Sequence, residues 1–147
     1  MKIRYEIDPS MQEDEMVIRC KQISPKLLEV ERVFNSDVVE SVFGELDNKI
    51  FPIKAMTIER IYSEARKTIV FAKGETYESK FSLSKFETIL PPSFVRISKS
   101  VIANTKLIRS IESEFSGNFT LIFMSGSKEI LSRTYVKDLK TAIGLEG

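Results

Sequence analysis

The chain has 147 residues, of which 42% are hydrophobic, and a formal net charge of +1. This is enough for one full hydrophobic core, or for a domain of about a hundred residues with a smaller appended unit. There is no histidine and only one cysteine, which excludes an intramolecular disulfide, His-dependent catalysis and the usual His or Cys zinc sites.

The N-terminal third predicts a small, partly apolar unit. Residues 2–7 and 16–20 are short runs compatible with two strands, joined by an acidic loop. Ser24-Pro25 predicts the start of a helix, because serine caps free amide groups and proline suits the first helical position. We therefore expect residues 1–45 to form a β–β–α extension.

From about residue 46 the pattern becomes one of strands. The expected strands occupy residues 49–53, 58–63, 68–72 and 76–81, with Arg66-Lys67 in the first turn. A helix follows, in which Ser84 and Glu87 have capping-box spacing, and Pro91-Pro92 ends it.

The C-terminal third predicts more strands and one last helix. We expect strands at residues 94–102, 108–114, 119–124 and 129–131, and then a helix that begins near Ser132 and stops at Gly144. The predicted fold class is therefore mainly β (α+β).

Catalytic and ligand-binding patterns are missing from the sequence. The glycines form neither a phosphate-binding loop nor a dinucleotide-binding motif, and the acidic run at 13–15 reads as solvated surface. We expect no enzyme activity, no cofactor, no metal and no small-molecule substrate. No apolar leader or membrane-spanning run is present, so we expect a cytoplasmic protein.

Charge is distributed unevenly along the chain. Residues 1–45 carry six basic and ten acidic side chains, a balance of −4, whereas residues 46–147 carry sixteen and eleven, a balance of +5. The second segment is therefore the part that suits a polyanionic partner.

The most informative stretch is residues 94–104, Phe-Val-Arg-Ile-Ser-Lys-Ser-Val-Ile-Ala-Asn, which reads as a strand interrupted by Arg96, Ser98, Lys99 and Ser100. Further anchors are Ile58-x-x-Ile61-Tyr62, Leu83-x-x-Phe86-Glu87-x-x-Leu90 with its prolines, and Ser132-Arg133-x-Tyr135 after Gly126. Together these motifs resemble the LytTR DNA-binding domain family over residues 46–147.

This resemblance implies a bacterial transcription-factor module of elongated, antiparallel strands, which places loops and strand ends in successive major grooves. Carried over by position, the implied DNA contacts are Arg66, Lys67, Ser98, Lys99, Ser100 and Arg133. Many members have His where Ser98 stands, and often Arg or Asn at the position of Lys99. The base preference therefore does not follow from the resemblance.

The residue chemistry supports distinct roles at these positions. A bidentate arginine matches the O6 and N7 acceptors of guanine, so Arg133 is our first choice as a base reader, whereas Lys67 and Lys99 suit phosphates. Arg96 is expected to pair with a carboxylate and Asn104 to serve a turn or cap.

Our interpretation is a sequence-specific transcriptional regulator that reads the major groove and binds double-stranded DNA as a homodimer. The chain lacks the length for the receiver domain of response regulators, so residues 1–45 are expected to act in regulation or oligomerisation, with a membrane protein as a candidate partner. The alternative is a LytTR-like module that binds another regulator or a membrane protein instead of DNA.

Overall fold

The computed structural model describes residues 2–35 and 38–145. Antiparallel strands dominate this part of the chain, as the sequence predicts. The strands are β1 (Ser41–Leu46), β2 (Lys49–Lys54), β3 (Ile58–Glu64), β4 (Lys67–Ala72), β5 (Glu75–Ser79), β6 (Phe94–Ser98), β7 (Val101–Asn104), β8 (Ile108–Ser113), β9 (Phe119–Phe123) and β10 (Lys128–Leu131). The helices are α1 (Pro25–Asn35), α2 (Leu83–Ile89) and α3 (Val136–Ala142), and single 3-10 turns, η1 (Ala55–Thr57), η2 (Thr105–Leu107) and η3 (Arg133–Tyr135), link neighbouring elements.

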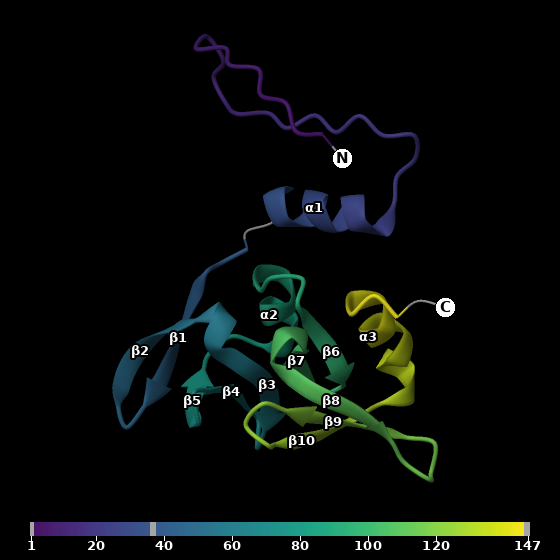
Figure 1. Cartoon of the computed structure of the whole chain (residues 1–147). Coiled ribbons are helices and arrows are strands. Elements are labelled where there is room, and N and C mark those ends of the chain that lie inside the picture. Colours follow the sequence, from purple (N-terminus) through teal and green to yellow (C-terminus); the bar gives the residue numbers. More distant parts are fainter. Residues whose placement is uncertain (1, 36–37, 146–147) are drawn as a thin grey trace.

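The strands form two antiparallel sheets. The larger sheet has seven strands in the order β2-β1-β5-β4-β3-β7-β6, and the smaller has three in the order β10-β9-β8. Helices α2 and α3 lie on the side of the strands that faces α1, and the N-terminal segment lies beyond α1 (Figure 1). None of the helices within residues 2–35 and 38–145 is long and apolar enough to cross a bilayer.

Each sheet has its own hydrophobic core. Helix α2 packs on the larger sheet with Phe86, which is fully buried among strand residues such as Ile58, Ile61 and Val70. The second core joins the smaller sheet to α3 and to the β6–β7 hairpin; its members are Ile97, Val101, Ala103, Leu121, Phe123, Leu131 and Leu139. Burial of each large apolar side chain contributes about 1.5–3 kcal/mol.

A charged cluster joins the two sheets. A bulge in β3 between Ile58 and Arg60 turns Glu59 inward, where its Oε1 accepts a hydrogen bond from Ser125 N (3.2 Å) in the β9–β10 turn. Arg60 Nη1 lies 2.6 Å from Glu59 Oε2, and Arg60 Nε lies 3.2 Å from Oε1 of Glu129 on β10. These contacts tie β3 of the larger sheet to β10 and the turn of the smaller one.

Helix α2 begins two residues earlier than its capping-box spacing predicts. Ser82 is the N-cap, and its hydroxyl accepts a hydrogen bond from Lys85 N (3.1 Å). The Ser84–Glu87 capping box is therefore wrong, because Ser84 already lies inside the helix. The predicted stop at the other end of the chain is confirmed: Gly144 follows α3 with φ +80°, a conformation that glycine adopts without steric cost.

The N-terminal extension departs from the predicted β–β–α order. Helix α1 is confirmed, but residues 2–7 and 16–20 form no strand. Ile3, Tyr5 and Ile7 are 80–90% exposed, so the alternating pattern is present without a partner strand or a core to pack on. The β–β part of the prediction is wrong for this physical reason.

The proposed division of the chain at residue 45 stays a prediction. Strand β1 crosses that boundary and pairs with β2 over its whole length, while its register with β5 contains the pair Glu45–Glu78. Val42 of β1 is buried in the larger core. The sheet that β1 joins therefore begins before residue 45.

Candidate nucleic-acid interface

The 94–104 stretch forms a hairpin instead of the single strand that the sequence predicts. Strands β6 and β7 pair with Ser98 opposite Val101, which leaves Lys99 and Ser100 as a two-residue turn. The strands bury Ile97 and Ile102, and the polar side chains gather near the tip. The unusual polar residues of this stretch are thus explained by a turn, whose residues have to face solvent.

Three chain reversals meet along one edge of the molecule. The β3–β4 turn lies beside the β6–β7 turn, since Ser63 N donates to Ser100 O at 2.9 Å. The segment that leads into η3 lies beside β6, since Ser132 N donates to Ile97 O at 2.9 Å. We call this the turn edge; it carries Arg66, Lys67, Ser98, Lys99, Ser100 and Arg133.

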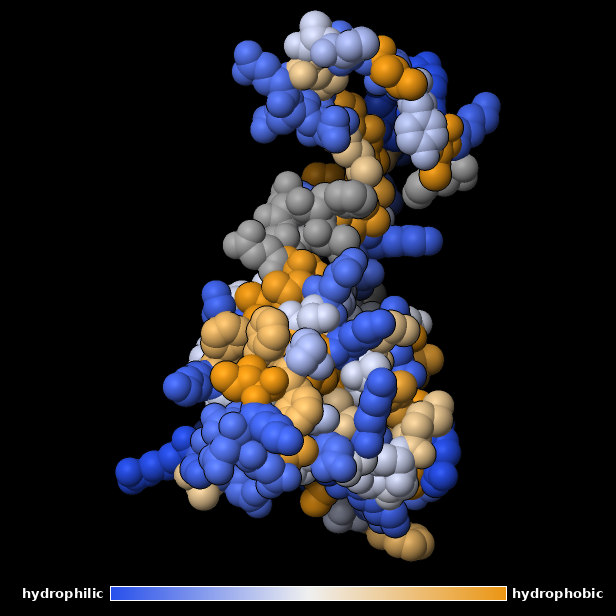
Figure 2. Space-filling view, turned by 90° about the vertical axis from the view of Figure 1, so that its left-hand side faces the viewer, coloured by the Kyte–Doolittle hydropathy of each residue, from blue (hydrophilic) through white to orange (hydrophobic). Residues whose placement is uncertain are grey.

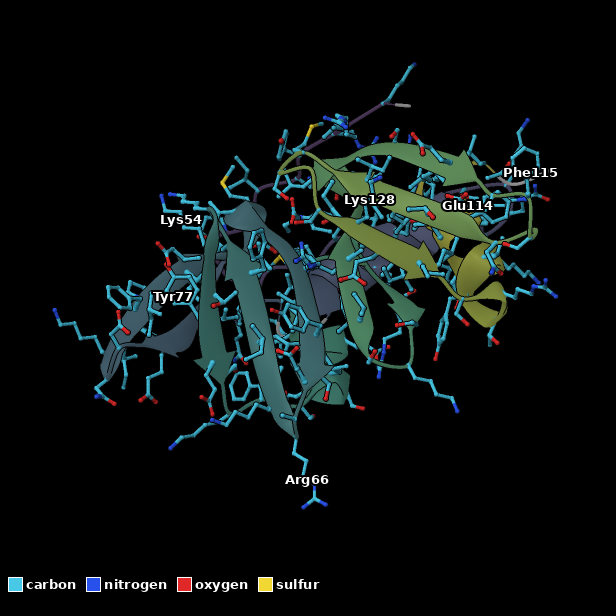
Figure 3. All side chains as sticks on the ribbon, turned by 90° about the horizontal axis from the view of Figure 1, so that it is seen from below. Lys54, Arg66, Tyr77, Glu114, Phe115 and Lys128 are labelled. Atoms are coloured by element: carbon cyan, nitrogen blue, oxygen red, sulfur yellow. The ribbon has the colours of Figure 1, made fainter. Side chains whose placement is uncertain are left out.

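Arg66 projects from the first of these reversals into solvent (Figure 3). The turn is formed by Ala65 and Arg66, one residue earlier than predicted, and Lys67 is the first residue of β4. Both turn residues have positive φ, 49° and 65°, although neither is Gly, Asn or Asp. Side chains other than these are disfavoured in this conformation by about 1–2 kcal/mol each. The hairpin therefore has a strained backbone conformation at Arg66, whose guanidinium is exposed.

Lys67 makes one ion pair at the surface. Its Nζ lies 3.4 Å from Glu78 Oε2 on β5, and both side chains are exposed. Such a pair is weak and exchanges with water, so Lys67 remains accessible to another anion.

Arg96 braces the second reversal from behind. Its Nε donates to Ser98 O at 3.1 Å and its Nη2 donates to Lys99 O at 2.6 Å, while Nη1 pairs with Glu87 of α2. The expectation that Arg96 pairs with a carboxylate is confirmed. Arg96 is thereby directed at the turn backbone, and the Lys99 side chain is left exposed.

A groove of about 440 Å³ lies between the β6–β7 hairpin and β10. Its lining residues are mostly hydroxyl-bearing or charged: Ser98, Ser100, Val101, Thr120, Lys128, Glu129, Ile130 and Ser132. Lys128 and Thr120 were not among the predicted contacts, because they are distant in sequence and only the pairing of β9 with β10 brings them here. The Ser98 hydroxyl accepts a hydrogen bond from Ser100 N (3.3 Å), which stabilises the turn beside this groove.

Arg133 occupies the far end of the turn edge. It is exposed and is the first residue of η3. Its Nη2 lies 3.4 Å from Ser116 O in the β8–β9 hairpin loop, a long and weak hydrogen bond. Most of the guanidinium's donors therefore face solvent.

Electrostatics at the groove are set by Glu129 and Arg60. Burial raises the pKa of the Glu129 carboxyl above its ordinary value of 4.5, and the attraction of Arg60 opposes that rise. Burial also raises the pKa of the nearby Tyr62 hydroxyl, again against the effect of Arg60. Arg60 stacks on Phe71, with its guanidinium carbon 4.4 Å from the ring centroid.

The expectation that Asn104 serves a turn or cap is confirmed. Asn104 is buried; its Nδ2 donates to Ile58 O (2.9 Å) and its Oδ1 accepts from Lys106 N (3.1 Å), which caps η2. No group of three or more metal-ligating side chains occurs within the part of the chain that the structure describes.

Residues 48–144 match the family model described as the LytTr DNA-binding domain. The chain belongs to the LytTR DNA-binding domain family. This is a family of DNA-binding transcription-regulator domains. All the predicted DNA contacts lie inside the matched residues.

Curated LytTR proteins and a solved structure extend this comparison. The transcriptional regulatory protein LytR of Staphylococcus aureus (strain N315) is 33% identical over 107 residues, which cover 72% of this chain and 44% of LytR. The sensory transduction protein LytT of Enterococcus faecalis is 29% identical over 100 residues, which cover 67% of this chain and 41% of LytT. The chain thus matches less than half the length of these relatives.

The solved LytTr DNA-binding domain of a putative methyl-accepting/DNA response regulator from Bacillus cereus superposes with a TM-score of 0.68 at 26% identity. The alignment covers 72% of this chain and 98% of that structure. The antiparallel, helix-poor LytTR architecture that the sequence predicts is confirmed by this match.

Proposed function

We propose that this LytTR chain is a sequence-specific transcriptional regulator that reads the DNA major groove with turn and strand-end residues. The observation that carries the proposal is the turn edge itself. Arg66, Lys99 and Arg133 come from three separate reversals of the chain, yet backbone hydrogen bonds align those reversals along one edge, and all three side chains are exposed.

The proposed division of labour follows from side-chain geometry. Arg133 offers a planar fork of donors for guanine O6 and N7, worth about 1–3 kcal/mol of discrimination between bases. Lys67 and Lys99 act as point charges on phosphates, supporting an affinity that falls with salt. The hydroxyls of Ser98 and Ser100 and the ammonium of Lys128 border the groove in which a phosphate backbone would lie.

The test is selection of duplexes from a randomised pool by the purified protein, followed by a salt series on the enriched duplex. We expect a recurring sequence motif, with Arg133→Ala relaxing the preference at one position and Lys99→Ala reducing the salt slope by about one. Absence of any enriched motif, with binding equal to scrambled DNA, would contradict the proposal.

Residues 1–45 are proposed to serve regulation or oligomerisation, with homodimers binding paired sites. Support comes from the acidic balance of this segment and from its exposed apolar side chains, among them Ile3 and Tyr5. Deletion of residues 2–37 keeps β1 and its buried Val42. An unchanged oligomeric state and unchanged regulation in that variant would contradict this role.

A second candidate function is binding to another regulator or to a membrane protein. It is favoured by an apolar groove of about 430 Å³ beside β1, with exposed Phe43, Ile50 and Phe81 on its rim. Figure 2 shows hydrophobic residues gathered on this side of the molecule. This surface lies apart from the turn edge, so substitutions there separate the two functions: Phe43→Ser should affect protein capture and leave duplex binding unchanged.

A further inference from the structure

Phe115 is the most exposed large apolar side chain among the described residues. It occupies the loop between β8 and β9 and is fully exposed. Most exposed apolar residues need no explanation, but an aromatic ring held clear of every neighbour forgoes the burial that normally stabilises it. A partner that covers the ring would recover this stabilisation.

The loop that carries Phe115 is ordered by its own hydrogen bonds. Glu114 N donates to Asn118 O at 2.8 Å, and Gly117 N donates to Glu114 O at 3.0 Å. The Glu114 carboxylate accepts a hydrogen bond from Thr120 Oγ1 at 3.0 Å, which holds its charge back on β9. The ring is thus presented by a closed turn, and the one acidic side chain beside it is engaged elsewhere.

The same loop touches the turn edge at Arg133. Ser116 O, next to Phe115, accepts the hydrogen bond from Arg133 Nη2. The loop also lies close to η3 through the strand pairing. Phe119, the first residue of β9 after the loop, pairs with Leu131, which comes just before Ser132 and η3. The aromatic ring and the proposed base reader therefore belong to one contiguous surface.

Arg66 and Phe115 leave the molecule at two well-separated corners (Figure 3). A duplex that contacts Arg66, Lys99, Arg133 and Phe115 would follow the edge between these two corners. Proteins that bend DNA commonly place an apolar side chain against a base step or sugar, where it partly replaces lost stacking.

Resting on the proposed function, we propose that Phe115 is a DNA-contacting residue that packs against a base step or deoxyribose next to the site of Arg133 and supports bending of the duplex. The contact is apolar, so it adds affinity without releasing counterions. That property separates it from every basic residue of the turn edge.

The experiment compares wild type with Phe115→Ala, Phe115→Leu and Arg133→Ala on the duplex that wild type enriches from a random pool. The matched control is Phe43→Ala, which removes an exposed aromatic ring (66% exposed) from β1, outside the family match. Affinity is measured across a salt series, bending by energy transfer between dyes on the duplex ends, and self-association by sedimentation.

We expect Phe115→Ala to weaken binding by about tenfold, the scale of one lost base–aromatic contact, with an unchanged salt slope and a smaller bend. Phe115→Leu should fall between Phe115→Ala and wild type, and Phe43→Ala should bind as wild type. Because Phe115 makes no packing contact, all variants are expected to fold.

Wild-type affinity and bending in Phe115→Ala, while Arg133→Ala binds weakly, would overturn the inference and leave the proposed function standing. A change in sedimentation alone would also overturn it and make Phe115 part of a protein contact. Failure of wild type itself to prefer any duplex would instead reject the proposed function, and this inference with it.

Discussion

Arg96 holds the backbone of Lys99: its Nη2 donates to the Lys99 carbonyl oxygen at 2.6 Å, while its Nε donates to Ser98 O. The third arm of the same guanidinium pairs with Glu87 of α2. Arg96, whose side chain is largely buried, thus anchors the β6–β7 turn to helix α2. The direction in which Lys99 leaves the protein is set by a residue that does not itself face the proposed DNA.

Arg96→Gln should therefore impair duplex binding through Lys99. We expect a loss of about 1–3 kcal/mol in unfolding free energy, because two turn carbonyls lose a charged donor. In duplex binding, the Arg96→Gln and Lys99→Ala losses should be non-additive, since both remove the same contact. Arg96→Lys should not restore binding, because the donors of an ammonium share one nitrogen and cannot reproduce the planar fork with which Arg96 reaches Ser98 O, Lys99 O and Glu87.

The control for the removed charge is Arg109→Gln, an exposed position near the opposite end of the smaller sheet, where Ile108 pairs with Phe123. Its duplex affinity should stay close to wild type. Strictly additive losses in the Arg96→Gln, Lys99→Ala double variant would contradict the positioning role.

A change in the β3–β4 turn that raises the unfolding free energy should lower the affinity for DNA. Replacing Ala65-Arg66 by Asn-Gly supplies residues that accept positive φ and is expected to raise the unfolding free energy by about 1–2 kcal/mol. Duplex affinity should fall, because the guanidinium is gone. Urea denaturation and duplex titration on the same samples measure both effects.

Asn48→Gly is the matched control for that turn. Asn48 also has positive φ, 62°, in the β1–β2 turn, but it lies away from the turn edge. A small gain in stability with unchanged affinity is expected there. An Asn-Gly variant at 65–66 that kept full affinity would remove Arg66 from the interface.

Stability should depend on pH through Glu129. Burial raises the pKa of its carboxyl above 4.5, so between that value and the raised one the folded state binds more protons than the unfolded state. The unfolding free energy therefore falls as pH rises through this window. Glu129→Gln should remove this fall, which appears as a pH-dependent difference from wild type in urea denaturation.

Glu75→Gln, an exposed change on β5, serves as the comparison for Glu129→Gln. The comparison separates an effect at the Glu129 site from a general effect of removing one acidic side chain. A pH profile of Glu129→Gln parallel to that of wild type would show that Glu129 does not titrate differently in the folded protein.

Arg60→Met should be among the most destabilising single changes at the joint between the sheets. It leaves the Glu59 carboxylate, which is buried, without its cation, a situation that costs about 3–5 kcal/mol. The Glu59→Gln, Arg60→Met double variant should recover part of the loss. A cost of only about 0.5 kcal/mol for Arg60→Met, typical of surface positions, would show that the cluster is not needed for folding.

Local patterns predicted the elements whose partners lie nearby in sequence. The β3–β4 and β4–β5 hairpins, the helix at Pro25 and the stop at Gly144 depend on alternation, caps and glycine conformation within a few residues. The capping box predicted at Ser84 was wrong, because Ser82, two residues earlier, is the N-cap.

Features that depend on tertiary pairing could not be predicted from the sequence. The Lys99–Ser100 turn has neither glycine nor proline, so nothing local marks it, and the strand prediction ran through it. The apolar alternation at Ile3, Tyr5 and Ile7 predicted a strand, but a strand needs a partner that the chain does not bring to it. The groove around Lys128 forms only when β10 meets the β6–β7 hairpin.

The proposed contact residues stand at the ends of strands whose middles build the cores. Changing Arg66, Lys99 or Arg133 leaves the buried side chains in place, and each residue sits on its own chain reversal. A duplicated copy of such a gene is thus free to drift toward a new operator one position at a time, without passing through an unfolded intermediate. Two sister regulators within one cell could in this way become insulated from each other's promoters while their folds stayed interchangeable.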